Sequence, residues 1–247
     1  MNLQSLKSEL KSIANEEKAA FLSRYFKAGN GEYGQGDKFL GITVPQQRNI
    51  AKKYVELEFK GIQKLLSSKI HEHRYAAFLI LIEKYRKTDK NEKNSSISAG
   101  KKKIFDFCIR NIKSANNWDL VDTMAPEILG DFLLERDKSL LYQLAKSKNL
   151  WERRIAIIST YTFIKKNYFA DSLKIAKLLL ADKHDLIHKA VGWMLREVGN
   201  RNQEWEEKFL KENIDKIPRT TLRYAIEKFS RKKRKFYMNF NKAQKIL

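Results

Sequence analysis

Apolar side chains recur at helical spacing along nearly the whole chain of 247 residues, and no segment alternates strictly between apolar and polar positions as a half-buried strand would. Only three prolines and ten glycines interrupt this pattern, so turn signals are few. We therefore predict an all-α protein. The expected helices lie near residues 2–13, 16–27, 44–55, 59–67, 70–86, 100–113, 117–124, 127–135, 139–147, 150–166, 169–181, 185–199, 202–213, 219–229 and 231–240.

A repeat emerges when the long predicted helices are aligned on a basic residue that apolar residues follow. Arg74, Arg154, Lys189 and Arg223 occupy this position, and the last three are spaced by 35 and 34 residues. Helix pairs of this period cannot bury their apolar faces alone, so they stack into an α-solenoid whose inner helices line a concave groove. An irregular helical bundle is the alternative that so loose a repeat leaves open.

The predicted organisation is a single repeat domain over residues 1–247, which is long enough to bury a continuous core. A polar insert of about 87–101 lies in the interval of 80 residues that separates Arg74 from Arg154. A basic segment of about 231–247 follows the repeats, and such a segment is more often solvated than bound to phosphate.

The balance of charges favours an anionic partner. Lys and Arg total 50 against 29 Asp and Glu, which gives a formal net charge of +21 and a pI near 9.8. Such a surface attracts nucleic acid or anionic membranes. No stretch approaches the roughly 18 apolar residues that span a bilayer, the start does not read as a signal peptide, and no basic amphipathic helix with exposed large apolar residues stands out. We expect no membrane partner.

Cys108 is the only cysteine, so no internal disulfide and no thiolate metal cage can form. This usage is typical of a reducing compartment, and we expect a cytoplasmic protein, associated with the nucleoid if the source is bacterial. Cys108 lies among apolar residues and is expected to be a small buried hydrophobe. His71 and His73, in the sequence HEH, are expected only to begin a helix, and we predict no metal site.

Trp193 lies outside the apolar stripe of the helix expected at 185–199, and it shares a basic face with Lys189 and Arg196. Packing of the indole against a neighbouring helix is one interpretation, and contact with a ligand is the other. The basic neighbours favour the second. The apolar stripe consists of Ile187, Val191, Met194 and Val198.

Arg154 interrupts an apolar stripe of the helix expected at 150–166, where a guanidinium needs a partner. That partner is either an acid on the next helix, which would make Arg154 a structural tie, or a phosphate oxygen bound in bidentate fashion. The sequence alone gives these two interpretations equal weight.

Asp122 stands near the predicted end of a short helix. Asn116 or Asn117 has the character of its N-cap, and the helix must end or kink before Pro126. The macrodipole opposes a negative charge there by several tenths of a kcal/mol, so the placement calls for a compensating role. Trp118 lies four residues earlier on the same face, so indole and carboxylate project together. The alternative is that Asp122 holds a nearby Arg or caps the following turn.

Four segments together resemble one family. NNWDLVDTMAPEILGDFLLE, LWERRIAIIS and HKAVGWMLREVG, with RYFKAGNGEYGQGDKFLGITVPQQR upstream, are similar to the AlkD-type DNA alkylation repair family of HEAT-like-repeat DNA glycosylases. The resemblance runs from about Arg24 to about Arg223. It implies an α-solenoid of HEAT-like repeats with a concave DNA-binding groove. It further implies an enzyme that hydrolyses the N-glycosidic bond of cationic N3- and N7-alkylated purines in DNA and leaves an abasic site.

The resemblance also implies the site residues. The aspartate and the tryptophan pair of the family match Asp122, Trp118 and Trp193, which are therefore the expected catalytic residues. The family's arginine, which holds a backbone phosphate, matches Arg154. Some members of the wider superfamily lack these residues and are thought to bind DNA structures without excising bases, which is the alternative function. The expected DNA-binding residues are Arg154, Arg196, Lys189 and Tyr25.

The implied chemistry suits these residue types. An alkylated purine already carries positive charge, so no general acid has to protonate the leaving group. Asp122 can stabilise the oxocarbenium-like sugar and orient or deprotonate the attacking water. The faces of Trp118 and Trp193 can contact the cationic nucleotide. No lysine is matched beside Asp122, so we predict a monofunctional enzyme without a Schiff-base step.

The expected partner is double-stranded DNA that contains alkylated purines, and the resemblance implies excision without flipping of the base into a deep pocket. We expect no cofactor, no obligate protein partner and a monomer. A helical-repeat scaffold for a protein partner is a further alternative, which the excess of 21 positive charges disfavours.

Overall fold

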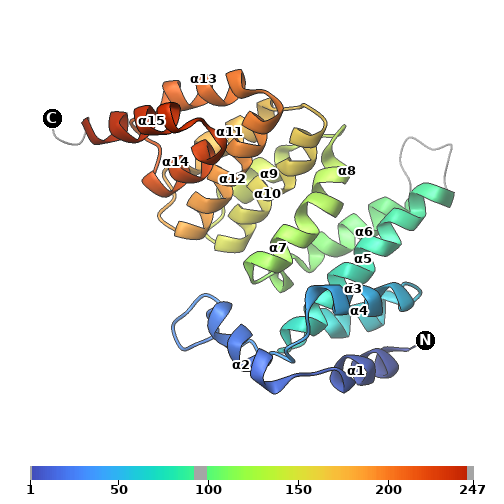
Figure 1. Ribbon diagram of the computed structural model, residues 1–247. Coiled ribbons are helices and arrows are strands. Elements are labelled where there is room, and N and C mark those ends of the chain that lie inside the picture. Colours follow the sequence, from blue (N-terminus) through green and yellow to red (C-terminus); the bar gives the residue numbers. More distant parts are fainter. Residues whose placement is uncertain (1, 92–98, 244–247) are drawn as a thin grey trace. The chain divides into compact units, whose positions relative to one another are not determined.

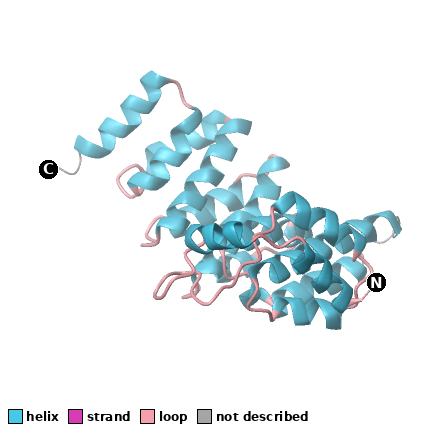
Figure 2. Cartoon of the chain, turned by 60° about the horizontal axis from the view of Figure 1, so that its bottom comes forward, coloured by secondary structure: helices cyan, strands magenta, loops and turns pink. Residues whose placement is uncertain are grey.

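A computed structural model describes residues 2–91 and 99–243 of the chain (Figure 1). Within these ranges the chain forms helices and no strand, and its one β-type contact is an isolated bridge between Lys38 and Ile70 (Figure 2). The predicted all-α class is confirmed. The helices are α1 (Leu3–Ser12), α2 (Glu16–Tyr25), α3 (Val44–Lys53), α4 (Phe59–Leu66), α5 (His71–Asn91), α6 (Ala99–Arg110), the 3₁₀ turn η1 (Ile112–Ser114), α7 (Trp118–Met124), the π-helix η2 (Ala125–Gly130), α8 (Asp131–Leu133), α9 (Ser139–Ala145), α10 (Leu150–Lys165), α11 (Ala170–Leu179), α12 (Asp185–Arg201), α13 (Gln203–Asn213), α14 (Arg219–Ala225), the 3₁₀ turn η3 (Ile226–Lys228) and α15 (Arg231–Ala243).

Asparagine side chains begin several of these helices. Asn15 Oδ1 accepts the N–H of Lys18 at 2.8 Å before α2, and Asn149 Oδ1 accepts the N–H of Trp151 at 2.8 Å before α10. Asn202 caps α13 in the same way. These caps satisfy backbone donors that the first helical turn leaves without a partner. They explain why the helix starts were readable from local sequence.

Contacts between Cα atoms divide the chain into two compact units, Met1–Met124 and Ala125–Leu247. In the first unit, α5 is central, because α3, α4, α6 and α7 all pack against it, and α1 packs against α3 (Figure 1). The segment of α5 from Tyr75 to Ile82 is buried throughout. The single repeat domain expected over residues 1–247 stays a prediction.

The second unit is a stack of helix pairs. α10 packs against α9, α11 and α12, and α12 packs against α11, α13 and α14 (Figure 1). Arg154 on α10, Lys189 on α12 and Arg223 on α14 therefore stand on successive helices of the stack. This is the arrangement expected of an α-solenoid, in which each pair buries its apolar face against the next pair.

The alignment of Arg74 with Arg154 is wrong by one residue. Arg74 Nη1 donates to the carbonyl of Ser68 at 2.7 Å, and Arg153 Nη1 donates to the carbonyl of Ser147 at 3.0 Å. Each of these arginines also pairs with an aspartate from another segment. Arg153, rather than Arg154, therefore makes the contacts that Arg74 makes in the first unit.

The helix that carries Asp122 does not stop before Pro126. α7 ends at Met124 as expected, but the chain continues as the π-helix η2 and then as α8 without an intervening loop. Proline has no N–H to donate, which disrupts the regular i→i−4 ladder and favours such a change of helix type. Thr162 Oγ1 donates to the carbonyl of Pro126 at 2.7 Å. Because the helical backbone continues, the argument that Asp122 opposes a helix C-terminal dipole was wrong.

The polar insert begins later than predicted, since α5 runs on to Asn91 and α6 begins at Ala99. The rest of the insert, residues 92–98, lies outside the described residues, as do residues 244–247 of the basic C-terminal segment. Cys108 is fully buried, as expected. In the part of the chain that the structure describes, no helix is both long enough and apolar enough to span a membrane.

Candidate active site

Trp118 and Asp122 lie four residues apart on α7, and both side chains are half-buried. Asn117 precedes the helix directly and is fully buried. Its Oδ1 accepts the N–H of Trp118 at 2.8 Å, and its Nδ2 donates to the carbonyl of Phe26 at 3.2 Å. Of the two asparagines predicted to cap this helix, Asn117 is the one that directly precedes it, although its side chain accepts the N–H of the next residue rather than that of the second or third helical residue. It ties the first turn of α7 to the end of α2.

The aromatic rings of Phe26 and Tyr25 pack against the indole of Trp118. Phe26 stacks on it with a centroid distance of 5.1 Å and an interplanar angle of 28°. Tyr25 meets it edge-on at 5.9 Å. Tyr25 is 54% exposed and stacks in turn on Phe21, which is 57% exposed. The structure therefore brings Tyr25 and Trp118 together, two residues that the sequence had assigned to one site.

A buried chain of polar groups adjoins this aromatic cluster, since the ring of His71 stacks on that of Phe26. Arg74 Nη2 pairs with Asp37 Oδ2 at 2.6 Å, and the same carboxylate oxygen lies 3.2 Å from His71 Nδ1. His71 Nε2 lies 2.8 Å from Asp119 Oδ2. Asp119 follows Trp118 directly, so this chain, Arg74–Asp37–His71–Asp119, ends in the first turn of α7. We refer to these four residues as the His71 network.

The imidazole of His71 is 3% exposed. Burial alone would lower the pKa of His71, but the charge and hydrogen bond of Asp119 and the hydrogen bond of Asp37 outweigh burial and raise this pKa to about 9. His71 does begin α5, as expected, but the expectation that it does nothing else was wrong. The sequence could not reveal its partners, because they lie 34 and 48 residues away along the chain.

Trp193 lies on α12 in the second unit and is half-buried. Its ring contacts that of Tyr161 on α10 at a centroid distance of 5.7 Å. Its Nε1 donates to Glu197 Oε1 at 3.0 Å, one helical turn further along α12. Trp193 therefore packs against a neighbouring helix, and its contact with a ligand stays a prediction.

Carboxylates balance the basic face of α12. Arg196 forms ion pairs with Glu227 and, at 3.6 Å, with Glu197. Lys189 Nζ lies 2.7 Å from Asp185 Oδ2. The sequence indicated a basic surface here, but the neighbouring acids reduce the local excess of positive charge. A phosphate that bound Arg196 would have to share the guanidinium with these carboxylates or displace them.

Arg154 is 5% exposed, and its Nη1 donates to the carbonyl of Leu186 at 2.5 Å. The contact links α10 to the start of α12 and is the kind of bond that a structural tie makes. The role of Arg154 toward phosphate stays a prediction.

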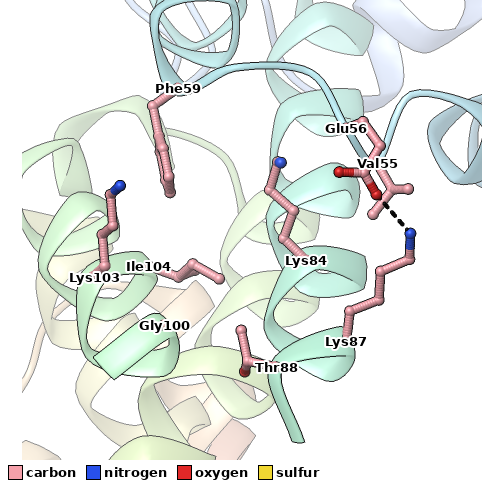
Figure 3. Close-up of a pocket in the computed structure, with 9 residues that line it drawn as sticks. All are labelled: Val55, Glu56, Phe59, Lys84, Lys87, Thr88, Gly100, Lys103 and Ile104. Carbon is pink, nitrogen blue, oxygen red and sulfur yellow. Dashed lines mark hydrogen bonds and ion pairs between the residues drawn. The ribbon is translucent and has the colours of Figure 1, made fainter. Parts of the chain in front are cut away.

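A separate hollow of about 270 Å³ in the first unit gathers positive charge (Figure 3). Lys84 and Lys103 lie over the ring of Phe59, 6.0 and 5.1 Å from its centroid, while Lys87 pairs with Glu56 at 2.8 Å. Burial and the charges of neighbouring lysines lower the pKa of Lys84 against the opposing effect of Glu56. None of the seven predicted site residues lines this hollow.

The seven predicted site residues thus fall into two groups. Tyr25, Trp118 and Asp122 belong to the first unit, and the other four belong to the second. That all seven residues belong to one site stays a prediction. Within the described residues, 2–91 and 99–243, no group of three or more His, Cys, Asp or Glu side chains is arranged so that it could hold a metal ion.

Comparison with known proteins identifies the family. The family model described as DNA alkylation repair enzyme matches residues 6–229 of the chain. The chain belongs to this family. A solved structure described as a predicted DNA alkylation repair enzyme from Enterococcus faecalis shares 18% sequence identity and a TM-score of 0.67, with coverage of 88% of this chain and 97% of that chain. At this identity the likeness shows the fold alone. No curated protein matched the chain.

Membership in the DNA alkylation repair family confirms the coarse part of the predicted function. DNA is the substrate that the family implies, and enzymatic repair of alkylation damage is its role. The predicted motif segments lie inside the matched range, so Trp118, Asp122, Arg154 and Trp193 are all part of the family domain.

Proposed function

We propose that the protein is a monofunctional DNA glycosylase that hydrolyses the N-glycosidic bond of cationic N3- and N7-alkylated purines. Family membership supports action on alkylated DNA. The observation that carries the proposal is the pairing of Trp118 and Asp122 on one face of α7, both half-buried, with the indole packed by Tyr25 and Phe26. An aromatic face and a carboxylate held side by side suit a substrate that is both aromatic and cationic.

Asp122 supplies the chemistry in this proposal. The alkylated base leaves as a neutral molecule, and positive charge moves onto the sugar as the bond breaks. A fixed carboxylate near that sugar stabilises the developing charge, and it can also orient or deprotonate the attacking water. The motif around it, NNWDLVDTMAPE, contains no lysine, which favours hydrolysis over a Schiff-base intermediate.

Trp118 and Trp193 contact the cationic nucleotide through their ring faces in this proposal. Arg154, Arg196, Lys189 and Tyr25 contribute to DNA binding, and the net charge of +21 attracts the backbone regardless of sequence. Excision proceeds without base flipping, on a monomer that needs no cofactor and no protein partner.

Single-turnover release of base from duplex DNA containing 7-methylguanine tests the proposal. The wild type should release the base, whereas Asp122→Asn should bind the same DNA and lose about 100-fold or more in rate. Asp215→Asn, which changes an exposed aspartate of the second unit, is the matched control and should keep the wild-type rate.

Two outcomes would contradict the proposal. Equal loss of DNA binding and excision in Asp122→Asn would assign Asp122 a structural role. Tight binding without release of either 7-methylguanine or 3-methyladenine by the wild type would favour the alternative of a non-catalytic protein that binds DNA structures.

A further inference from the structure

The hydrogen-bond pattern around His71 fixes its charge state. Both ring nitrogens lie within hydrogen-bond distance of a carboxylate, Nδ1 at 3.2 Å from Asp37 and Nε2 at 2.8 Å from Asp119. An ionised carboxylate only accepts hydrogen bonds, and a neutral imidazole carries a single N–H. With both carboxylates ionised, both contacts are therefore made at once only by the doubly protonated imidazolium.

The charges of the His71 network balance with the imidazolium in place. Arg74 and His71 then offset Asp37 and Asp119, all within one buried cluster. The next acidic residue, Glu72, is engaged elsewhere, because its carboxylate oxygens accept the N–H groups of Leu40 and Gly41 at 2.9 Å. Loss of the proton from His71 would leave one buried negative charge without a counterion.

The network reaches the proposed active site by two routes. The His71 ring packs against Phe26 at a centroid distance of 5.0 Å, and Phe26 stacks on Trp118 at 5.1 Å. In addition, Asp119 lies three residues before Asp122 on α7, and side chains at this spacing are neighbours on a helix surface. An Asp119 without its counterion would put a second negative charge beside Asp122.

We propose that protonated His71 is a positioning residue for the reaction of Asp122. Its bond to Asp119 holds the first turn of α7, and with it the indole of Trp118, in place. Its charge neutralises Asp119, so that Asp122 remains ionised beside the substrate. This inference rests on the glycosylase function proposed above, and it adds a buried group that touches neither DNA nor the reacting atoms.

The test compares pH profiles of single-turnover base release for wild type, His71→Gln, Asp119→Asn and the double variant. His71→Gln should lower the rate by about tenfold to a hundredfold, as small displacements of reacting groups do. It should also move the acid limb of the profile upward by about one pH unit, because the uncompensated Asp119 makes Asp122 easier to protonate. The double variant, which restores the charge balance, should return the acid limb to its wild-type position.

His73, two residues after His71 on α5, provides a matched control. His73 is also buried, but burial and the charges of Lys7 and Arg74 lower its pKa to about 4, and its Nδ1 lies 3.0 Å from the hydroxyl of Ser68. His73→Gln should therefore leave the acid limb unmoved. A slower His71→Gln whose acid limb also stays in place, or a double variant that is not rescued, would reduce His71 to a packing residue and overturn the proposal.

A second measurement does not depend on whether the variants fold. In wild-type protein with labelled histidine, the His71 signals should show an imidazolium at pH 7.5 that loses its proton near pH 9. A neutral ring at pH 7.5 would overturn the proposal. Failure of the glycosylase function itself would be recognised separately, because then the wild type would release no base at any pH.

Discussion

Glu206→Gln should stabilise the protein increasingly as the pH rises. Glu206 lies on α13 and is 1% exposed, and its Oε1 has no hydrogen-bond partner. Burial, with a contribution from the charge of Glu207, raises the pKa of Glu206 from 4.5 to about 9, while Arg196 opposes the shift. The carboxyl is therefore neutral in the native state at pH 7, and an amide of the same shape can replace it.

The magnitude follows from this pKa difference. When the pKa of an acid is raised on folding, the native state binds a proton that the unfolded state lacks, so stability falls as the pH rises from about 4.5 to about 9. Each pH unit in this window costs about 1.4 kcal/mol, which amounts to at most about 3.5 kcal/mol at pH 7. Glutamine removes this cost because it does not titrate.

Urea denaturation of wild type and Glu206→Gln at several values between pH 5 and pH 9 measures the effect. The difference in unfolding free energy should be small near pH 5 and grow with pH by about 1.4 kcal/mol per unit. Glu204→Gln, which changes an exposed acid in the same helical turn, is the control and should show no such growth. A difference that stays constant from pH 5 to pH 9 would refute the argument that Glu206 folds in its neutral form.

Arg154→Ala should lower the unfolding free energy by about 1–3 kcal/mol, because the part-buried bond to the carbonyl of Leu186 is lost, and it should also weaken DNA binding at fixed salt. Lower stability in urea with an unchanged Kd would rule out the phosphate role. Gly192→Ala should cost about 1–3 kcal/mol, because a Cβ there would lie 2.6 Å from the carbonyl of Thr221 and force α12 away from α14. Gly61→Ala, whose Cβ meets only the flexible side chain of Leu57, is its control, and equal urea midpoints for both variants would contradict this account.

Most of the secondary structure could be predicted from local sequence. The stripe Ile187, Val191, Met194 and Val198, predicted to be the buried side of its helix, is buried throughout. Pro126 was correctly read as the point where regular α-helix ends. The path of the chain after Pro126 was not predicted correctly. Whether the chain leaves the helix or continues as a π-helix depends on packing partners such as Thr162.

The candidate site was predictable only in part. The sequence pointed to Tyr25 and Trp118, and the structure places their rings in contact. The sequence did not indicate that Asp119 is a partner of His71, or that the carboxylate of Glu197 accepts the hydrogen bond of Trp193. The first partnership spans 48 residues, so no local pattern encodes it.

The sequence by itself determined the helical class, the helix starts and the surplus of positive charge, because spacing, capping residues and composition act over a few residues or over the whole chain. Only the tertiary structure decided which charges are compensated. In the folded chain Arg196 pairs with Glu227, and His71 lies between two aspartates that are distant from it in sequence. The state of an ionisable group depends on its burial and on the charges within a few ångströms, and these are properties of the packed chain.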